Sequence, residues 1–389
     1  MKVLMVDTGV YLPGGENYYE SFNYYKVLAR AGFDVSLYKN LYYDKPKEIS
    51  VQTREAVLKK IYNMIITFSP MDFPFINEYI KRTRVNPIII FVDKFEFIKD
   101  LAAKVSIFDF PFQRIKRNFT KLVGNIDMYV VFSHEDELLA KKLFGENEAI
   151  KRMLPFIDHA YFVRSNEQLK DDPKKPILFF SRLSSRQTNL DLIVKAVDYI
   201  VKDTDFLETN DLLIEITASG GDKESFQEVL RKKKLLEYFR FIPILPRELY
   251  ISYLREHRFS FMAPMKHLDL KQIIISLASG VPVLIDDEFN EKIDPFSGAR
   301  LDRFFTSDIN AIVKDNVNGM IYKRLDYKDL AEKMMQMASM DLSSMKNKAL
   351  ESVEKFDIES GGANFLKMIK EVINKESKYG SEQLLDREL

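Results

Sequence analysis

The stretch of sequence that decides the fold is FSFMAPMKHLDLKQIIISLASGVPVLI, which runs from Phe259 to Ile285. A short apolar segment at residues 259–262 is followed by a polar loop, and apolar residues then recur at helical spacing until Gly280 ends the helix. Residues 281–285 are typical of a second buried strand. This order predicts a βαβ unit of a parallel sheet, with the polar loop at its carboxyl edge, where anionic ligands are held beside helix amino ends.

Length and composition indicate what kind of protein contains this βαβ unit. The chain has 389 residues, which predicts two domains rather than one core. Hydrophobic residues make up 46% and charged residues 30%, as in soluble globular proteins. Because 58 basic residues balance 58 acidic ones, no overall field recruits nucleic acid, and a nucleic-acid partner is not expected.

Residue usage excludes several kinds of site. The chain has no cysteine, so a disulfide framework, a thiolate metal site and a cysteine nucleophile are excluded. Its four histidines show no metal-ligand spacing, so we expect no structural zinc. Residues 2–6 are typical of a strand rather than of a signal peptide, and no apolar run has the length of a membrane span. The expected location is the cytoplasm.

The first half of the chain alternates apolar segments with helix-length segments, which predicts a doubly wound α/β domain. Gly14 and Gly15 lie in the loop after the first strand, where adjacent glycines let a ligand approach backbone N–H groups; a plain tight turn is the alternative. Asp93 follows the strand at residues 88–92, at its carboxyl end. The dinucleotide-binding order G-x-G-x-x-G is absent.

Residues 110–122, FPFQRIKRNFTKL, interleave basic and aromatic side chains. Such a segment is a candidate for peripheral contact with an anionic membrane surface or for binding a phosphorylated acceptor. A solvated helix face is the alternative.

The second half begins after a polar, proline-bracketed linker at residues 166–176. Its first strand, at residues 177–180, leads into a loop that contains Arg182 and Arg186. Two guanidinium groups at a strand's carboxyl end suit a diphosphate, because each pairs with phosphate oxygens. Gly220 stands in a glycine turn after another strand, at residues 212–218.

The order of these features resembles the glycosyltransferases of the GT-B fold, specifically the retaining family 4. The sequence PGG at residues 13–15 is similar to the double-glycine loop of that family, and LPFID at 154–158 is similar to its I-P-N-G-V-D phrase. SRLS at 181–184, with Arg186 near a lysine position, resembles G-R-L-S-x-x-K. SLASGVPV at 276–283 resembles the end of the signature E-x7-E-A-M-A-x-G-x-P-V, and NVNGMI at 316–321 the later N-G-L-V turn.

The resemblance covers nearly the whole chain and implies an α/β fold of two Rossmann-like, doubly wound domains that face a cleft. The implied division is an acceptor domain at residues 1–165, the linker at 166–176, a donor domain at 177–355, and C-terminal helices at 356–389 that cross back to the first domain. Residues 286–311 are an insertion without an assignment.

The implied function is transfer of a hexose from a nucleotide-sugar to an unidentified glycan, lipid or protein acceptor, with retention of configuration. The arginines replace a metal ion in offsetting the charge of the leaving diphosphate, so no metal or other cofactor is expected. The catalytic candidates are Asp93 and His267. The donor-binding candidates are Gly14, Gly15, Arg182, Arg186, Gly220, Lys271 and Gln272.

The signature is incomplete in this chain, which leaves alternatives open. Its first glutamate falls on His267 and its second on Ile275, which cannot accept the hydrogen bonds of a donor ribose. The histidine expected after the fourth strand falls on Val92. A non-catalytic GT-B relative that serves as a binding or scaffold protein is therefore one alternative, and a sugar-nucleotide epimerase is another.

Overall fold

The computed structural model describes residues 1–8, 16–40, 49–93, 98, 125–145, 149–162, 176–179, 188–217, 221–243, 245, 247–264, 270–287 and 308–385. The chain divides into two compact units. Among the described residues, the first unit comprises residues 1–156 and 357–385, and the second comprises residues 157–287 and 308–356.

Six of the described strands form the parallel sheet of the first unit, in the order β2-β1-β3-β4-β5-β6. The strands are β1 (Lys2–Asp7), β2 (Asp34–Lys39), β3 (Met64–Thr67), β4 (Ile88–Val92), β5 (Met128–Val131) and β6 (Ile150–Arg152). The helices of this unit are α1 (Glu16–Arg30), α2 (Arg54–Val57), the 3₁₀ turn η1 (Pro70–Asp72), α3 (Phe73–Thr83), α6 (His134–Phe144) and α16 (Ile358–Leu385).

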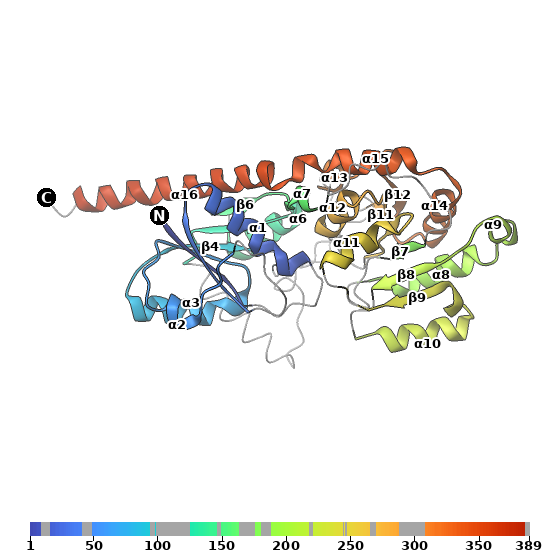
Figure 1. Cartoon of the computed structure of the whole chain (residues 1–389), viewed down its shortest axis with the longest axis horizontal. Coiled ribbons are helices and arrows are strands. Elements are labelled where there is room, and N and C mark those ends of the chain that lie inside the picture. The colour runs from blue at the N-terminus through green and yellow to red at the C-terminus, as the bar shows by residue number, and fades with distance from the viewer. Residues whose placement is uncertain are drawn as a thin grey trace. The chain divides into compact units, whose positions relative to one another are not determined.

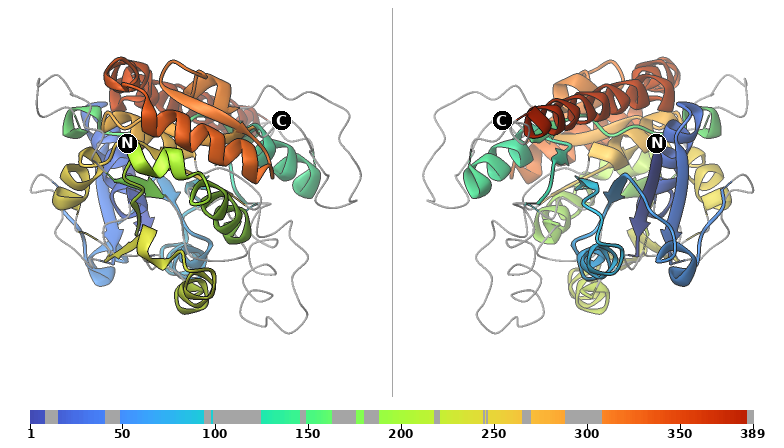
Figure 2. Two further views of the ribbon diagram at one scale, coloured as in Figure 1. Left: turned by 90° about the vertical axis from the view of Figure 1, so that its right-hand side faces the viewer. Right: turned by 90° about the vertical axis from the view of Figure 1, so that its left-hand side faces the viewer.

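The two faces of this sheet bury separate cores. Val3 and Met5 of β1 pack with residues of α1 and α16, whereas Leu4 and Val6 pack with residues of α3 and α6 on the other face. This alternation follows from the period of two along a strand. Figures 1 and 2 show α1 and α16 along one face of the sheet and α3 on the opposite face.

Two glycines let α16 approach its neighbours in the first unit. A Cβ atom at Gly361 would lie 2.4 Å from the Cβ of Phe156, and one at Gly362 would lie 2.5 Å from a methyl carbon of Val27 on α1. Both distances are too short for real atoms, so only glycine permits this packing. The C-terminal segment therefore completes the core of the first unit, as a single helix.

Six further strands form the parallel sheet of the second unit, in the order β12-β11-β10-β7-β8-β9. They are β7 (Ile177–Phe179), β8 (Ile214–Thr217), β9 (Phe239–Ile242), β10 (Ser260–Phe261), β11 (Val283–Asp287) and β12 (Gly319–Lys323). The helices are α7 (His159–Phe162), α8 (Leu190–Ile200), α9 (Thr204–Thr209), α10 (Lys223–Lys233), η2 (Leu236–Tyr238), α11 (Arg247–Arg255), α12 (Leu270–Ala278), α13 (Asp308–Ile312), α14 (Tyr327–Ser339), α15 (Ser343–Ser352) and η3 (Glu354–Phe356).

The stretch at residues 259–285 forms the βαβ unit β10-α12-β11. Gly280 has φ of 73° and ends α12 in a Schellman arrangement, in which the N–H of Val281 donates to the carbonyl of Ser276 at 3.0 Å. The strands differ slightly from the predicted ranges, since β10 is shorter than residues 259–262 and β11 begins after Pro282 rather than at residue 281. Pro282 has no N–H for a ladder bond, although its carbonyl accepts from Ser260.

The prediction of two doubly wound α/β units is confirmed by these two parallel sheets, each flanked by helices. Most of the unassigned insertion at residues 286–311 lies outside the described residues, which include its beginning in β11 and its end in α13.

Candidate functional site

Each sheet has a topological switch point, where successive strands are added in opposite directions. In the first sheet β2 lies on one side of β1 and β3 on the other. In the second sheet β8 and β9 lie on one side of β7, and β10 to β12 on the other. Open parallel sheets bind ligands outside the carboxyl ends of the strands that flank such a point. The ends of β1 and β3, and of β7 and β10, therefore define one candidate site in each unit.

In the second unit, the residues that follow the segment after β7 lie beside the residues that precede the segment after β10. Residues 180–187 follow β7 and residues 265–269 follow Pro264, and both segments lie outside the described residues. Thr188 forms a β-bridge with Pro264, and the N–H of Asn189 donates to the carbonyl of Ala263 at 2.8 Å. The end of residues 180–187 and the start of residues 265–269 are therefore held at the same edge of the sheet.

The helix amino ends at this edge suit an anionic ligand. Asn189 is the N-cap of α8, and its side-chain oxygen accepts from the N–H of Leu192 at 3.0 Å. Lys271 and Gln272 lie in the first turn of α12. Gln272 is half-buried, whereas Lys271 is only 6% exposed and so is not a freely solvated surface residue.

Four of the predicted site residues of the second unit, Arg182, Arg186, Gly220 and His267, lie outside the described residues. Their roles stay predictions. Ile275, at the position of the second signature glutamate, is fully buried in α12.

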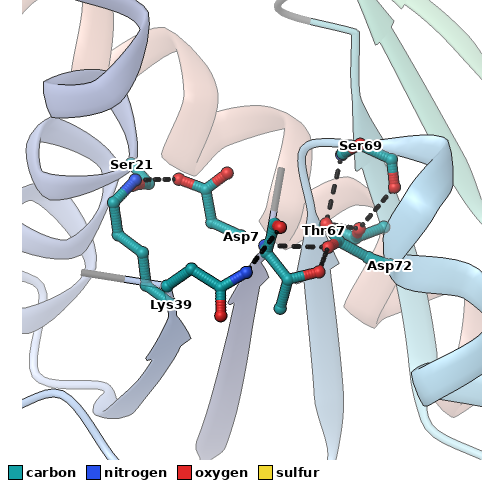
Figure 3. A network of polar contacts seen from close by, with 8 residues as sticks. Asp7, Ser21, Lys39, Thr67, Ser69 and Asp72 are labelled. Carbon is teal, nitrogen blue, oxygen red and sulfur yellow. Dashed lines mark hydrogen bonds and ion pairs between the residues drawn. The ribbon is translucent and has the colours of Figure 1, made fainter. Parts of the chain in front are cut away.

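In the first unit, a fully buried ion pair lies beside the switch point (Figure 3). Asp7 ends β1 and Lys39 ends β2, and the Lys39 ammonium donates to the Asp7 carboxylate. The same ammonium donates to the hydroxyl of Ser21 on α1 at 3.1 Å and lies 5.2 Å from the ring centroid of Phe22. Lys39 thus joins the carboxyl ends of two strands to α1.

A second buried carboxyl group, that of Asp72 in η1, lies between the ends of β1 and β3 (Figure 3). Its Oδ1 accepts from the N–H of Thr8 at 2.9 Å and from the Thr8 hydroxyl at 2.6 Å. Its Oδ2 accepts from the Thr67 hydroxyl at 2.8 Å and from the N–H of Ser69 at 3.2 Å. Burial, and then the charge of Asp7, raises the pKa of Asp72 to about 6 although hydrogen bonds from Thr8 and Thr67 lower it.

Asp93 lies at the carboxyl end of β4, and its side chain is 2% exposed. Its Oδ2 accepts from the hydroxyl of Tyr129 at 2.7 Å and from the N–H of Ile98 at 2.9 Å. Asp93 at the end of β4 is thus hydrogen-bonded to Ile98 and to Tyr129 of β5, and its catalytic role stays a prediction. Gly14 and Gly15, and the basic segment at residues 110–122, lie outside the described residues.

Sequence reasoning missed Lys39 and Asp72 as parts of this edge. For the ion pair the available signal was the charged residue that ends each of the segments KVLMVD and DVSLYK, Asp7 and Lys39. A lysine at such a position is usually exposed, and only the packing of α1 over it makes it a buried cation.

A further polar cluster lies in the second unit, away from the carboxyl edge. Glu215, the second residue of β8, accepts from Arg240 at 2.6 Å and from the Tyr253 hydroxyl at 2.7 Å, and lies 3.1 Å from Nε2 of His257. The His257 contact, followed by the Tyr253 hydrogen bond and the Arg240 charge, lowers the pKa of Glu215 to about 2 despite its burial. These contacts tie β8 to β9 and to α11.

No protein-family model and no curated protein matches the sequence. Solved structures share its fold. Sucrose-phosphate synthase from Thermosynechococcus elongatus aligns with a TM-score of 0.68 at 12% identity, over 96% of this chain and 99% of that chain. The lipopolysaccharide outer core galactosyltransferase WaaB aligns with a TM-score of 0.62 at 12% identity, over 95% and 99%. HepE from Anabaena, in complex with UDP and glucose, aligns with a TM-score of 0.62 at 11% identity, over 95% and 100%.

These likenesses show that the chain has the fold of GT-B glycosyltransferases. Within the part of the chain that the structure describes, no helix combines the length and the apolarity that a membrane span requires. The same residues contain no group of three or more histidine and acidic side chains placed to hold a metal ion.

Proposed function

We propose that this protein is a glycosyltransferase that uses a nucleotide-sugar donor. The observation that carries the proposal is the GT-B fold, shared over nearly the whole chain with glycosyltransferases. The second unit supports it, because the segment with Arg182 and Arg186 leaves one strand at the switch point and the segment with His267 follows its neighbour. A complex of HepE with UDP and glucose makes a uridine nucleotide the first donor to test.

In the proposed reaction the bond between the anomeric carbon and the diphosphate oxygen breaks, and a hydroxyl oxygen of the acceptor bonds to that carbon. The proton of that hydroxyl leaves with a base, and the nucleoside diphosphate carries away the electron pair. Arg182 and Arg186 stabilise the departing diphosphate without a metal ion, because fixed cations aimed at developing charge lower the barrier. Lys271, Gln272 and Gly220 complete the donor site, and the anomeric configuration is retained.

The first unit holds the acceptor in this proposal, and Gly14 and Gly15 offer backbone N–H groups to the donor phosphates. Asp93 and His267 are the proposed groups that assist the transfer.

The test is a thermal-shift screen of nucleoside diphosphates and nucleotide-sugars. A ligand that binds only the native state raises the melting temperature. At a concentration 100 times its Kd, the free energy of unfolding increases by about 2.7 kcal/mol. We expect a shift with one nucleotide, and its loss in an Arg182→Ala, Arg186→Ala double variant. The matched control is Arg231→Ala with Lys233→Ala, which removes two exposed cations from the last turn of α10 and should keep the shift.

If no nucleotide or nucleotide-sugar shifts the wild-type protein, the proposed function is wrong. If the shift persists in the double variant, the protein binds the nucleotide, but Arg182 and Arg186 are not part of the binding site. Release of the nucleoside diphosphate in the presence of candidate acceptors then measures transfer.

A binding protein without transferase activity is the second candidate, and one observation favours it. Ile275 puts a fully buried apolar side chain at the position of the second signature glutamate. A nucleotide-sugar that binds but is neither transferred nor hydrolysed would support this candidate.

A further inference from the structure

Exposed cations gather at the amino edge of the sheet in the first unit, where β1, β3 and β4 begin. The backbone joins the starts of these strands, because Asn63 donates its N–H to the carbonyl of Lys2 at 2.9 Å and accepts at its own carbonyl from the N–H of Ile88 at 3.0 Å. The residues at and before these strand starts include six exposed cations, Lys2, Lys59, Lys60, Lys81, Arg82 and Arg84. The chain as a whole is neutral, so this edge differs in charge from the protein as a whole.

A buried tyrosine holds the end of α3 against the turn before β3. The Tyr79 hydroxyl accepts from the N–H of Tyr62 at 2.9 Å and donates to the carbonyl of Lys60 at 3.1 Å. Both tyrosine side chains are buried, and their ring centroids lie 6.0 Å apart. The cations of the last turn of α3, and Arg84 at its C-cap, therefore lie near those of the turn before β3.

Ile61, in the same turn, exposes an apolar side chain among these cations. It is 60% exposed, more than any other large hydrophobic side chain of the described residues. Its neighbours Lys60 and Tyr62 are both hydrogen-bonded to Tyr79, so the backbone is fixed on each side of it. The exposure of Ile61 is therefore built into the fold.

The positive charge of this edge is not neutralised by other described residues. None of the six cationic side chains forms an ion pair within the part of the chain that the structure describes, whereas Arg54 of α2 is paired with Glu78. The carboxylates at the starts of the neighbouring strands are those of Asp34 and Asp127, and the second accepts from the N–H of Ile89 at 2.7 Å. The edge thus keeps an excess of positive charge.

We propose that the amino edge of the first sheet is a docking surface for an anionic lipid membrane. The cations attract anionic head groups, and Ile61 enters the boundary between head groups and acyl chains. A nucleic acid would also attract the cations through its phosphates, but phosphates offer no apolar surface to Ile61. The inference does not depend on the proposed nucleotide-sugar donor.

Docking at this edge leaves the candidate site of the first unit open. Asp7, Lys39 and Asp72 lie at the carboxyl ends of the strands, and all strands of this sheet run parallel. A membrane at the amino edge therefore lies at the opposite end of the sheet from these residues.

The first experiment is flotation of the full chain with vesicles of phosphatidylcholine, alone or mixed with anionic phosphatidylglycerol. The test variant is Lys59→Gln with Lys60→Gln. The matched control is Lys367→Gln with Lys370→Gln, which removes the same charge from exposed positions of α16 in the same unit.

We expect the wild type to bind the anionic vesicles and not the neutral ones. Each cation near an anionic membrane strengthens binding about fivefold, so the Lys59 and Lys60 double variant should bind about 25-fold more weakly. The control should bind as the wild type does. Added salt should weaken binding, because it screens the attraction.

The second experiment tests whether Ile61 enters the membrane. The chain contains no tryptophan, so Ile61→Trp introduces a single indole. Its fluorescence should shift to shorter wavelength with anionic vesicles, and lipids with brominated acyl chains should quench it. The control is Val229→Trp on α10 of the second unit, where the native side chain is 43% exposed, and its emission should not change.

Three results would overturn the proposal. The first is a wild type that does not bind anionic vesicles, or a Lys59 and Lys60 double variant that binds them equally well. The second is an equal spectral shift for Ile61→Trp and Val229→Trp, which would indicate adsorption without a defined surface. The third is tighter binding of polyuridylate RNA than of the vesicles, lost in the same double variant, which would make this edge a nucleic-acid site.

Discussion

Replacing Lys39 with methionine tests whether the carboxyl edge of the first sheet is held by a buried ion pair. Both side chains of the Lys39–Asp7 pair are fully buried. Methionine is close to lysine in length, and can keep contact with Phe22 while it removes the charge and the hydrogen bond to Ser21. Lys39→Met therefore removes the cation and leaves most of the packing.

The expected cost is large because the Asp7 carboxylate stays in the interior. Removing one partner of a buried pair costs about 3–5 kcal/mol. The neighbouring Asp72 adds to this cost, since its charge and that of Asp7 repel each other. For a unit of this size, each kcal/mol lowers the melting temperature by about 2–4 °C, so the expected shift is about 6–20 °C.

The assay is differential scanning calorimetry of a double-mutant cycle, because a chain with two units can unfold in steps that calorimetry resolves. The cycle contains Lys39→Met, Asp7→Asn and the double variant. The double variant should be more stable than Lys39→Met alone, because it buries no unpaired charge at this position. A shift below about 2 °C for Lys39→Met, or a double variant less stable than Lys39→Met, would refute the assignment of a buried ion pair.

Three further predictions concern stability. Gly361→Ala should destabilise the first unit by about 1 kcal/mol or more, because overpacking against Phe156 outweighs the gain in helix propensity. Thermal melts measure the loss. The control is Gly221→Ala, because a Cβ atom at Gly221 would meet nothing within 4 Å. Leu325→Asn should raise the free energy of unfolding, measured in urea titrations, by about 0.5–1 kcal/mol. Leu325 is 56% exposed and has φ of 63°, a left-handed conformation that asparagine tolerates better than leucine. A lower free energy of unfolding in the variant would contradict this prediction. Glu215→Gln should remove a contribution to the free energy of unfolding that depends on pH. The pKa of Glu215 is lowered from its ordinary value of 4.5 to about 2 in the folded protein, so its ionised form stabilises the fold above about pH 4.5, and this stabilisation is lost as the pH falls toward 2. The melting-temperature gap between wild type and Glu215→Gln should therefore narrow from pH 6 to pH 3, and a constant gap would show that ionisation is not involved.

Much of the fold was predictable from the sequence because it depends on local patterns of apolar residues and glycines. The βαβ unit around α12 was predicted from helical spacing and the glycine stop, and the structure confirms both. Strand ends were less accurate, since they depend on where the ladder of a neighbouring strand stops. The apolar segment at residues 259–262 thus gives a strand that ends at Phe261, opposite Phe179, the last residue of β7.

The candidate site was predictable only in part. Glycines and arginines in loops after strands are visible in one sequence, and they led to Gly14, Gly15, Arg182 and Arg186, all of which lie outside the described residues. The burial of Lys39 and Asp72 has no such local signal. Each gains its role from residues distant in sequence, since Asp72 and Thr8 are separated by 64 positions and Lys39 and Asp7 by 32.

The sequence alone determined the period of each strand and helix, and therefore two doubly wound α/β units, because backbone geometry and apolar spacing are local properties. Only the tertiary structure decided the order of the strands in each sheet, and with it the two switch points. It also decided that Asp7, Lys39 and Asp72 are buried together at one of them. Burial and electrostatic coupling arise between distant segments, so no single stretch of the chain contains them.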